Sequence, residues 1–246
     1  MDAPYSLFMR QAQHICRANM CMGRRLPIQI IMKLDILYED ENIIVVHKPA
    51  GVAVENARAT SMDIVAMVRN HFLPDSSYVG LVHRLDQPVE GIVVIGKNKA
   101  ATAKLSKELQ QHNFTKRYYA LVTGEVPESG RLEDYIAKDA KTKMAVDATS
   151  DNGKKSALEY KVVEMPDGQD ADITCLDILL ETGRFHQIRF QLSKRGWPIL
   201  GDVKYGGEND SRFKRGAIAL CAYELSFTHP VTGETMTYRI KPKWLP

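Results

Sequence analysis

The segment His83-Arg84-Leu85-Asp86 places one carboxylate between two strand-like stretches of this 246-residue sequence. A short apolar approach, Tyr78-Val79-Gly80-Leu81-Val82, precedes it, and the run Gly91-Ile92-Val93-Val94-Ile95 follows it. A carboxylate between two β-type segments can be held at the mouth of a cleft, where the arginine two positions earlier helps to dock a polyanion. Taken alone, such an aspartate is more often a turn cap or an ion-pair partner.

Five further motifs accompany this segment in a defined order. His47-Lys48-Pro49-Ala50-Gly51-Val52 precedes it, and it is followed by Lys116-Arg117-Tyr118-Tyr119-Ala120-Leu121-Val122, Glu181-Thr182-Gly183-Arg184-Phe185-His186-Gln187-Ile188-Arg189, Gly201-Asp202-Val203-Lys204-Tyr205-Gly206, and Leu220-Cys221-Ala222 with Leu225-Ser226-Phe227-Thr228-His229-Pro230. In this order the six motifs resemble the RluA-type family of RNA pseudouridine synthases, from about Leu34 nearly to the C-terminus. Any single motif can arise by chance, whereas six in order are specific.

The resemblance implies an isomerase that converts one uridine of a structured rRNA or tRNA to pseudouridine, with no metal or other cofactor. The reaction breaks the N1–C1′ bond and forms a C5–C1′ bond. By resemblance Asp86 is the catalytic carboxylate, which either traps C1′ covalently or removes a proton at C2′. Tyr118 is expected to lie against the base, with Tyr119 on the opposite face of its strand. Arg184 is the third catalytic residue and is expected to form a buried ion pair with Asp86; the alternative is a pair with Glu181.

Further residues are expected around the substrate. Arg84 is adjacent to the catalytic segment and is expected to occupy the gap left when the uridine flips out of the RNA. Leu220 matches an apolar family position under the base. The predicted substrate-binding residues are Arg84, His83, Leu220, Arg189 and Lys116. His186 is interpreted as a packing or hydrogen-bonding residue, Lys48-Pro49 and Gly51 as a supporting turn, and Asp202 and Tyr205 as shaping the loop after the helix.

One segment departs from the commoner family pattern. Where that pattern has a Thr-Ser pair before the glycine, this chain has Gln87-Pro88-Val89-Glu90-Gly91. A second carboxylate within a few ångströms of Asp86 would raise the pKa of that aspartate. Because the departing segment is next to Asp86, the sequence leaves open which RNA is the substrate.

Length and composition limit the classes of protein. With 246 residues, of which 44% are hydrophobic, the chain can bury one substantial core or two lobes that share a cleft. No apolar run approaches the roughly 20 residues that span a bilayer, so no membrane partner is expected. The four cysteines include no CxxC pair, and His14, Cys16 and Cys21 lack a fourth ligand, which predicts reduced thiols, a cytoplasmic protein and no metal site. The resemblance implies a monomer.

The net charge of +3 belongs to the N-terminal segment. Residues 1–31 carry four arginines against Asp2 alone, so residues 32–246 are neutral and the overall charge does not indicate RNA binding. Three local basic groups are more informative, and two of them flank the motifs, which favours a phosphate-contacting rim. They are Arg184, Arg189, Lys194 and Arg195; Lys204, Arg212, Lys214 and Arg215; and Lys97, Lys99, Lys104, Lys107, Lys116 and Arg117.

Residues 1–31 read as a separate extension. They have no clear period and four methionines, and Met32 stands directly before the family-like start. We expect a disordered basic tail or a start-site artefact, with a mitochondrial presequence as the less favoured alternative. The extension is too short for the S4 RNA-binding module that family members often carry. Residues 32–246 are expected to form the catalytic domain.

The pattern of apolar residues predicts more strands than helices. Strands are expected at 43–47, 91–96, 117–123, 157–164, 173–181 and 235–241. Helices are expected at 61–72 after Thr60 or Ser61, at 99–112 after Asn98, and from Arg184 to Arg195, ending at Gly196. Because strands and helices do not alternate, the prediction is an α+β fold with a mixed, largely antiparallel sheet, flanking helices and a central catalytic cleft.

Two other functions were weighed against the isomerase. A non-catalytic RNA-binding or chaperone protein on the same fold has no need for Asp86, Tyr118 and Arg184 together. A nucleoside or glycoside hydrolase normally uses two carboxylates at a set separation, and only Glu90 is near Asp86 in sequence. Both alternatives rank below the isomerase.

Overall fold

The computed structural model describes residues 33–56, 62–74, 78–164, 172–213 and 216–245. The predicted N-terminal extension, the predicted cap residues Thr60 and Ser61, and Lys214 and Arg215 lie outside these residues. The described elements are β1 (Asp35–Glu39), β2 (Ile43–Lys48), α2 (Ile64–Phe72), β3 (Gly80–Leu81), β4 (Glu90–Gly96), α3 (Lys99–Gln110), β5 (Thr115–Thr123), β6 (Ser129–Lys138), β7 (Ala145–Asp147), β8 (Lys154–Val163), β9 (Ile173–Leu180), α4 (Gln187–Lys194), the 3₁₀ helix η2 (Val203–Tyr205), β10 (Leu220–Thr228) and β11 (Thr235–Arg239).

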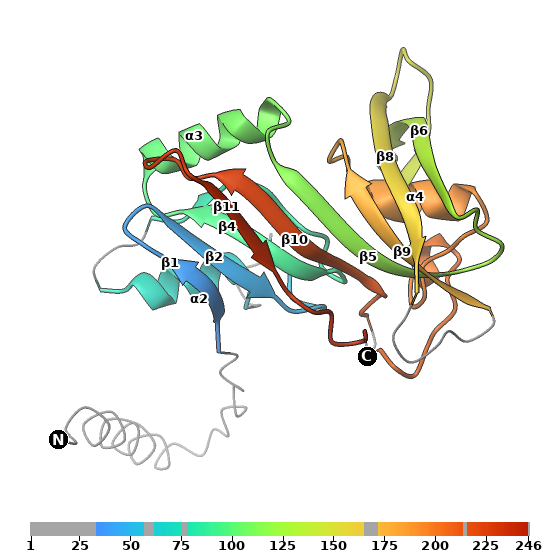
Figure 1. Cartoon of the computed structure of the whole chain (residues 1–246), viewed down its shortest axis with the longest axis horizontal. Coiled ribbons are helices and arrows are strands. Elements are labelled where there is room, and N and C mark those ends of the chain that lie inside the picture. Colours follow the sequence, from blue (N-terminus) through green and yellow to red (C-terminus); the bar gives the residue numbers. More distant parts are fainter. Residues whose placement is uncertain (1–32, 57–61, 75–77, 165–171, 214–215, 246) are drawn as a thin grey trace. The chain divides into compact units, whose positions relative to one another are not determined.

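The strands of the described residues form one mixed sheet (Figure 1). Its order is β1-β2-β4-β10-β5-β9-β8-β6-β7, with β11 paired to β10 and β3 paired to β4. Every pair is antiparallel except the one between β4 and β10. The predicted α+β fold with a largely antiparallel sheet is confirmed. The predicted strand set was incomplete, because β1, β3, β6, β7 and β10 were not among the expected strands.

Strand β10 connects three neighbours at the centre of the sheet. Its first part pairs in parallel with β4, where Ala222 lies opposite Gly91, and its later part pairs with β11. Gly91 has a φ of +150°, and a Cβ there would lie 2.5 Å from the Cβ of Ala222. This close approach requires glycine at the start of β4, directly after the segment that carries Asp86.

Helices cover both faces of the sheet at β2 and β4. Val93 belongs to the same buried cluster as Ile64 of α2, whereas Ile92 belongs to the cluster that includes Leu105 of α3. Successive strand residues point to opposite faces, so α2 and α3 pack on opposite sides (Figure 1). Burial on both faces explains why the sequences of β2 and β4 are apolar runs without alternation.

The cap of α2 differs from the prediction, and the cap of α3 agrees with it. The side chain of Asp63 accepts a backbone N–H of the first turn, so α2 begins three residues later than expected and is capped by neither Thr60 nor Ser61. Asn98 caps α3 as predicted. An aspartate placed two residues after a serine competes as a cap, and here it also accepts the backbone N–H of Asn56.

Helix α4 also begins three residues later than expected. Its N-terminal boundary is His186, which has a left-handed backbone with a φ of 52°. Such a conformation interrupts a helix, so Gly183, Arg184 and Phe185 form the preceding turn. The predicted C-terminal end is confirmed, because α4 ends at Lys194 and Gly196 follows with a φ of +79°.

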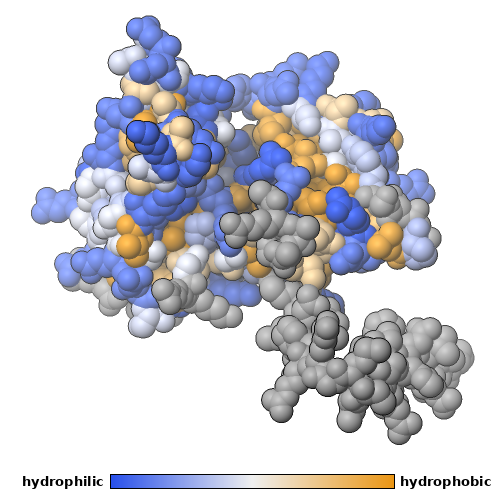
Figure 2. Space-filling model, turned by 180° about the vertical axis from the view of Figure 1, so that it is seen from behind, coloured by the Kyte–Doolittle hydropathy of each residue, from blue (hydrophilic) through white to orange (hydrophobic). Residues whose placement is uncertain are grey.

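The far half of the sheet, with β6, β8 and β9, has one covered face. Leu132, Leu158 and Leu192 of α4 are buried in one cluster, while alternate residues of β6 and β8 are exposed. Figure 2 shows largely hydrophilic residues over this half and hydrophobic residues gathered over the half that contains α2 and α3. Among the described helices, none has the length and apolar character that crossing a membrane requires.

Candidate active site

Asp86 lies in the loop that leads into β4. The loop is held by backbone hydrogen bonds, in which the N–H of Val89 donates to the carbonyl of Asp86 (3.1 Å) and the N–H of Gly51 donates to the carbonyl of Gln87 (2.8 Å). The predicted supporting turn at Lys48-Pro49 and Gly51 is therefore confirmed. The segment that carries Asp86 is anchored to the end of β2 on one side and to β4 on the other.

Lys48 is the central anchor of this loop. Its side chain is completely buried and its ammonium donates to the carbonyls of Pro49 (3.1 Å), Val52 (2.7 Å) and Gln87 (3.2 Å). Burial lowers the pKa of Lys48 to about 8, against the opposing charges of Asp86 and Glu90. A cation held beneath the residue next to Asp86 favours the ionised form of that carboxylate.

The arginine that binds Asp86 is Arg189. Its Nη1 donates to Asp86 Oδ2 at 3.1 Å, while its Nε and Nη2 donate to the two oxygens of Asp202 at 2.7 Å each. The side chains of Arg189 and Asp202 are 5% and 1% exposed, and that of Asp86 is 26% exposed. Burial raises the pKa of Asp86, and the charge of Arg189 is the largest opposing effect. Asp86 Oδ1 has no partner among the described residues.

The expected ion pair between Arg184 and Asp86 is wrong. Arg184 is exposed, and its Nε donates to the backbone carbonyl of Lys155 at 3.1 Å. The prediction placed Arg184 in the first turn of helix α4. Because α4 begins at Gln187, Arg184 leaves the helix axis, and Arg189 on the second half-turn is the residue that reaches Asp86. Arg189, which was expected to bind substrate, is instead enclosed by two carboxylates and the ring of Tyr205.

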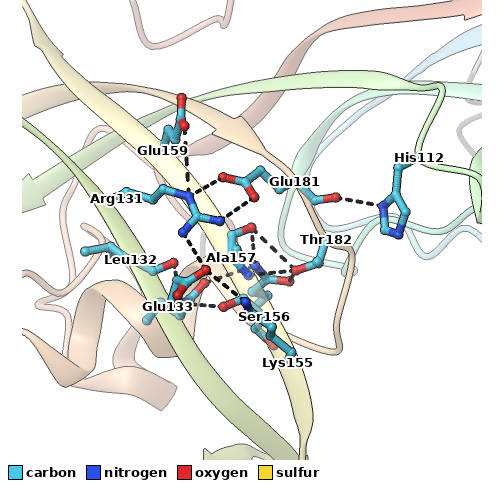
Figure 3. A network of polar contacts seen from close by, with 12 residues as sticks. His112, Arg131, Leu132, Glu133, Lys155, Ser156, Ala157, Glu159, Glu181 and Thr182 are labelled. Carbon is cyan, nitrogen blue, oxygen red and sulfur yellow. Dashed lines mark hydrogen bonds and ion pairs between the residues drawn. The ribbon is translucent and has the colours of Figure 1, made fainter.

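The alternative pair between Arg184 and Glu181 is also not formed. Glu181 accepts two hydrogen bonds from Arg131, at 2.7 and 2.8 Å, and Arg131 also contacts Glu133 and Glu159 (Figure 3). Figure 3 shows this Arg131 network spread across β6, β8 and the end of β9. Arg184 consequently has no carboxylate partner within the described part of the chain.

Tyr118 and Leu220 lie where they were expected. Both are buried side chains that line the cleft around Asp86. Tyr119 points to the other face of β5 and stacks on Tyr223 with 3.9 Å between ring centroids, so the predicted division of the two tyrosines is confirmed. Burial, followed by the charge of Asp86, raises the pKa of Tyr118, so its hydroxyl stays protonated at neutral pH.

His83 has a structural contact that the sequence did not indicate. Its Nε2 accepts the backbone N–H of Val94 at 3.2 Å, and its ring meets the edge of Phe114. Burial, with a further contribution from Lys116, lowers the pKa of His83 to about 3, so the imidazole is neutral. His83 therefore ties the segment before Asp86 to β4, although it also lines the cleft.

Arg84 and Lys116 are the predicted substrate-binding residues that face the open part of the cleft. The Arg84 side chain is 66% exposed and donates to Glu55, which is itself 48% exposed, at 2.7 Å. Exposed pairs of this kind exchange readily with other anions. Lys116 also lines the cleft, and burial together with the charge of Arg184 lowers its pKa.

His186 is a hydrogen-bonding residue, as expected. Its Nδ1 is 2.9 Å from the hydroxyl of Tyr205, and its Nε2 is 3.6 Å from Asp86 Oδ2. Burial, followed by the charge of Arg189, lowers the pKa of His186 to about 3, which keeps the ring neutral. Tyr205 and Asp202 do more than shape a loop, because they hold His186 and Arg189 against Asp86.

Glu90 was considered as a second carboxylate that would raise the pKa of Asp86, but its side chain pairs with His47 instead. Its carboxylate is buried and lies 2.9 Å from His47 Nε2, while His47 Nδ1 is 2.9 Å from Asp35. The hydrogen bond with Glu90 is the largest cause that raises the pKa of His47. Burial, and not a second carboxylate, is the main cause of the raised pKa of Asp86.

The predicted basic rim is smaller than the sequence indicated. Most cations of the three basic groups have protein partners: Lys194 and Arg195 with Asp134, Arg212 with Asp210, Arg117 with Asp177, Lys97 with Glu39, and Lys104 with the carbonyl of Pro230. The cations that line the cleft without a carboxylate partner among the described residues are Lys116 and Arg184. A phosphate contact is thus best supported at the cleft itself.

These residues surround a cleft of about 710 Å³. The lining residues include Arg84, Asp86, Arg184, His186 and Leu220. Figure 2 shows a hollow between the two halves of the surface. The volume lies within the range of sites that enclose a small ligand or a single nucleotide. A carboxylate, a protonated phenol and cations without a carboxylate partner among the described residues suit chemistry at a sugar carbon of a phosphate-linked substrate.

Two residues of this site, Lys48 and Asp202, have larger roles than the sequence predicted, because they anchor the loop of Asp86 and hold Arg189. Lys48 stands in an apolar strand, and a lysine that continues such a run is the signal of a buried, hydrogen-bonded ammonium. Asp202 is 13 residues from Arg189, with no periodicity linking them. No local pattern identifies that pair.

Comparisons with known proteins identify the family. A family model described as RNA pseudouridylate synthase matches residues 42–194. "Ribosomal large subunit pseudouridine synthase D" of Vibrio parahaemolyticus serotype O3:K6 is 35% identical over 221 residues, covering 83% of this chain and 66% of the relative, so the chain spans about two thirds of that protein. "Uncharacterized RNA pseudouridine synthase YlyB" of Bacillus subtilis is 33% identical over 214 residues, covering 84% of this chain and 68% of the relative.

Solved structures show the same fold. "Human RNA Pseudouridylate Synthase Domain Containing 1" superimposes with a TM-score of 0.69 at 22% identity, covering 85% of this chain and 83% of that one. "Human RNA Pseudouridylate Synthase Domain Containing 4" gives a TM-score of 0.67 at 21% identity, covering 86% and 90%. Together with the matched family model, these findings confirm the resemblance of the six motifs, and the chain belongs to the RNA pseudouridylate synthase family.

Proposed function

We propose that this protein converts a specific uridine of an RNA to pseudouridine, with Asp86 as the catalytic carboxylate. The observation that carries the proposal is the environment of Asp86 within the cleft of a chain from this family. Arg189 holds Asp86 Oδ2, and Oδ1 has no partner in the described residues. A carboxylate held by one oxygen and free at the other is oriented for attack at C1′ or for removal of a proton at C2′.

Tyr118 and Leu220 supply the surface on which the base would lie. Leu220 contributes an apolar contact, and the Tyr118 hydroxyl has no hydrogen bond within the described residues, so it is available to the base as it turns over. The raised pKa of Tyr118 makes the hydroxyl a donor. In the proposed pathway Asp86 acts at the sugar and Tyr118 contacts the base near C5.

Entry of the uridine into the cleft requires that it leaves its stack in the RNA. Arg84 lies on the rim, is exposed, and among the described residues pairs with the exposed Glu55 alone, so it is free to exchange that carboxylate for the RNA. Lys116 and Arg184, on the cleft wall, are the cations best placed for the phosphates that flank the flipped nucleotide. We keep Arg184 as a substrate-contacting residue in place of the ion-pair role first expected.

The relatives that are named for ribosomal large subunit modification favour rRNA over tRNA as the substrate. We further propose that residues 32–246 act as one catalytic domain, as a monomer in the cytoplasm. Cys175 and Cys221, the free cysteines among the described residues, are both buried, which is compatible with that location. Binding is expected to weaken steeply with salt, because cleft cations contact phosphates.

The decisive experiment uses purified protein, unmodified transcripts of large-subunit rRNA and tRNA, and chemical mapping of pseudouridine. Wild type is expected to modify one site, and Asp86→Asn is expected to modify none while binding the same RNA. The Asp86→Asn protein should melt within a few degrees of wild type, because Arg189 keeps its two bonds to Asp202. Equal modification by both proteins would remove Asp86 from the reaction. Tight binding without modification by wild type would favour the non-catalytic RNA-binding alternative.

A further inference from the structure

Phe185 presents an aromatic ring to solvent inside the cleft. The residue is 36% exposed and lines the same cavity as Asp86. Single apolar residues on a surface are common and need no function. The surroundings of Phe185 set it apart, because both faces of its ring have a defined neighbour and one of those neighbours touches the catalytic carboxylate.

The inner face of the ring lies on His186. The two rings are stacked with 3.8 Å between centroids and 19° between planes. His186 is itself held by the Tyr205 hydroxyl at 2.9 Å, and its Nε2 lies 3.6 Å from Asp86 Oδ2. The left-handed backbone of His186 sets this arrangement, since it ends the turn before α4 and places two successive rings face to face. Phe185 is therefore separated from the proposed catalytic carboxylate by one ring, that of His186.

The outer face of the ring is covered by one long side chain. The Lys138 ammonium lies 4.2 Å from the ring centroid, over the end of β6. Lys138 is exposed and has no carboxylate partner among the described residues. A cation over a phenyl ring at an exposed site is held weakly, so a larger planar group can replace it. Once displaced, the ammonium stays within reach of whatever covers the ring.

We propose that the outer face of Phe185 is the stacking site for a nucleobase next to the target uridine, with Lys138 moving from the ring to the phosphate of that nucleotide. This inference rests on the proposed function, because it places a neighbouring nucleotide beside the one that Asp86 acts on. Bases splayed out of RNA are bound by aromatic stacking combined with a basic contact to the backbone, and this pair supplies both. Stacking accepts any base, so the site contributes affinity and orientation rather than a strict sequence requirement.

A fluorescent reporter tests the contact directly. In Phe185→Trp the introduced indole is expected to lose much of its emission on titration with an oligouridylate of about ten nucleotides. An abasic ribose-phosphate of the same length and charge is expected to cause little loss. Wild type gives the background of Trp197 and Trp244, and Val231→Trp, in the exposed turn between β10 and β11, is the matched control. Equal quenching by both oligomers, or no quenching beyond these backgrounds, would overturn the proposal.

Kinetics on the RNA that wild type modifies provide a second test. Phe185→Leu is expected to raise KM about tenfold with kcat within about twofold, and Phe185→Tyr is expected to restore KM. Lys138→Ala should raise KM by a smaller factor, about threefold, and Lys138→Arg should restore it. An unchanged KM for Phe185→Leu would overturn the stacking site even if turnover is intact.

The two proposals fail in different ways. The fluorescence titration needs no turnover and can be repeated with Asp86→Asn present in the same chain. Quenching without any pseudouridine formation would support the stacking site and remove the isomerase function. Normal pseudouridine formation without selective quenching would do the opposite.

Discussion

Two arginine–carboxylate networks in this protein have nearly the same distances and very different surroundings. Arg189 binds Asp202 with two bonds of 2.7 Å, and Arg131 binds Glu181 with bonds of 2.7 and 2.8 Å. The Arg189 side chain is 5% exposed, whereas that of Arg131 is 43% exposed. The Arg131 network competes with water and salt, while loss of Arg189 would leave the buried charge of Asp202 without its cation. The two networks therefore differ in burial and not in bond length. The buried Arg189 network holds Asp86, whereas the exposed Arg131 network lies on the surface of the sheet.

The largest effect is expected from removing the buried arginine. Arg189→Ala should lower the free energy of unfolding by about 3–5 kcal/mol, because Asp202 and Asp86 are left without their cation. Urea unfolding followed by circular dichroism measures this change. Arg184→Ala, an exposed arginine of the same cleft, is the matched control and should change the free energy by less than about 1 kcal/mol. Similar losses of free energy for the two variants would contradict the expectation that a buried arginine stabilises the fold more than an exposed one.

An intermediate effect is expected at Asp134. Its side chain is 4% exposed and accepts from Gln191, while its cations Lys194 and Arg195 are 36% and 25% exposed. Asp134→Ala should cost about 2 kcal/mol, since the cations can turn to water but the buried amide of Gln191 loses its shortest hydrogen bond and keeps only the longer ones to the carbonyls of Leu132 and Ser156. A loss as large as that of Arg189→Ala would show that exposure of the partner cation does not matter.

A change in pH dependence is expected from Asp202→Asn. In the proposed reaction Asp86 acts as a carboxylate, so the turnover of bound RNA should fall as pH decreases through its raised pKa. Asp202→Asn keeps the shape of the side chain but removes the negative charge that offsets Arg189, so the pKa of Asp86 should decrease and the acid limb should move to lower pH. Single-turnover rates between about pH 4 and pH 8 measure the limb. A shift to higher pH would mean that Arg189 no longer reaches Asp86.

The smallest effect is expected in the exposed network. Arg131→Ala should leave the melting temperature and the pseudouridine yield unchanged within error, because its three glutamates are solvated. Adding salt should remove any residual difference between variant and wild type. A clear loss of stability that persists in high salt would show that the Arg131 network stabilises the fold more than its exposure predicts.

Much of the fold could be predicted from the sequence because its signals are local. The apolar runs of β2 and β4, the alternation in β8 and the cap residue Asn98 each depend on near neighbours in the chain. The opposite directions of Tyr118 and Tyr119 follow from the two-residue period of a strand. Strand β10 was not among the expected strands, because its pairing with β4 and β5 depends on residues far apart in the sequence.

The candidate site could be predicted in part. Asp86, Tyr118 and Leu220 come from motif order, and all three line the cleft. The arginine could not be assigned, because two arginines five residues apart compete and the choice depends on where α4 begins. That boundary is set by the left-handed backbone of His186, a conformation that no residue type other than glycine signals reliably.

The position of β10 in the sheet also has a consequence for synthesis on the ribosome. Strand β4, which follows Asp86, has β10 as its central neighbour, and β10 begins only at Leu220. A nascent chain that has exposed Asp86, Tyr118 and Arg189 still lacks the strand that joins the two halves of the sheet. More than a hundred further residues after Asp86 must be synthesised before β10 can pair with β4. Such long-range pairing is slow, and until it forms the open strand edge is exposed to mispairing or to chaperones. The cleft around Asp86 is therefore among the last parts of this protein to fold during synthesis.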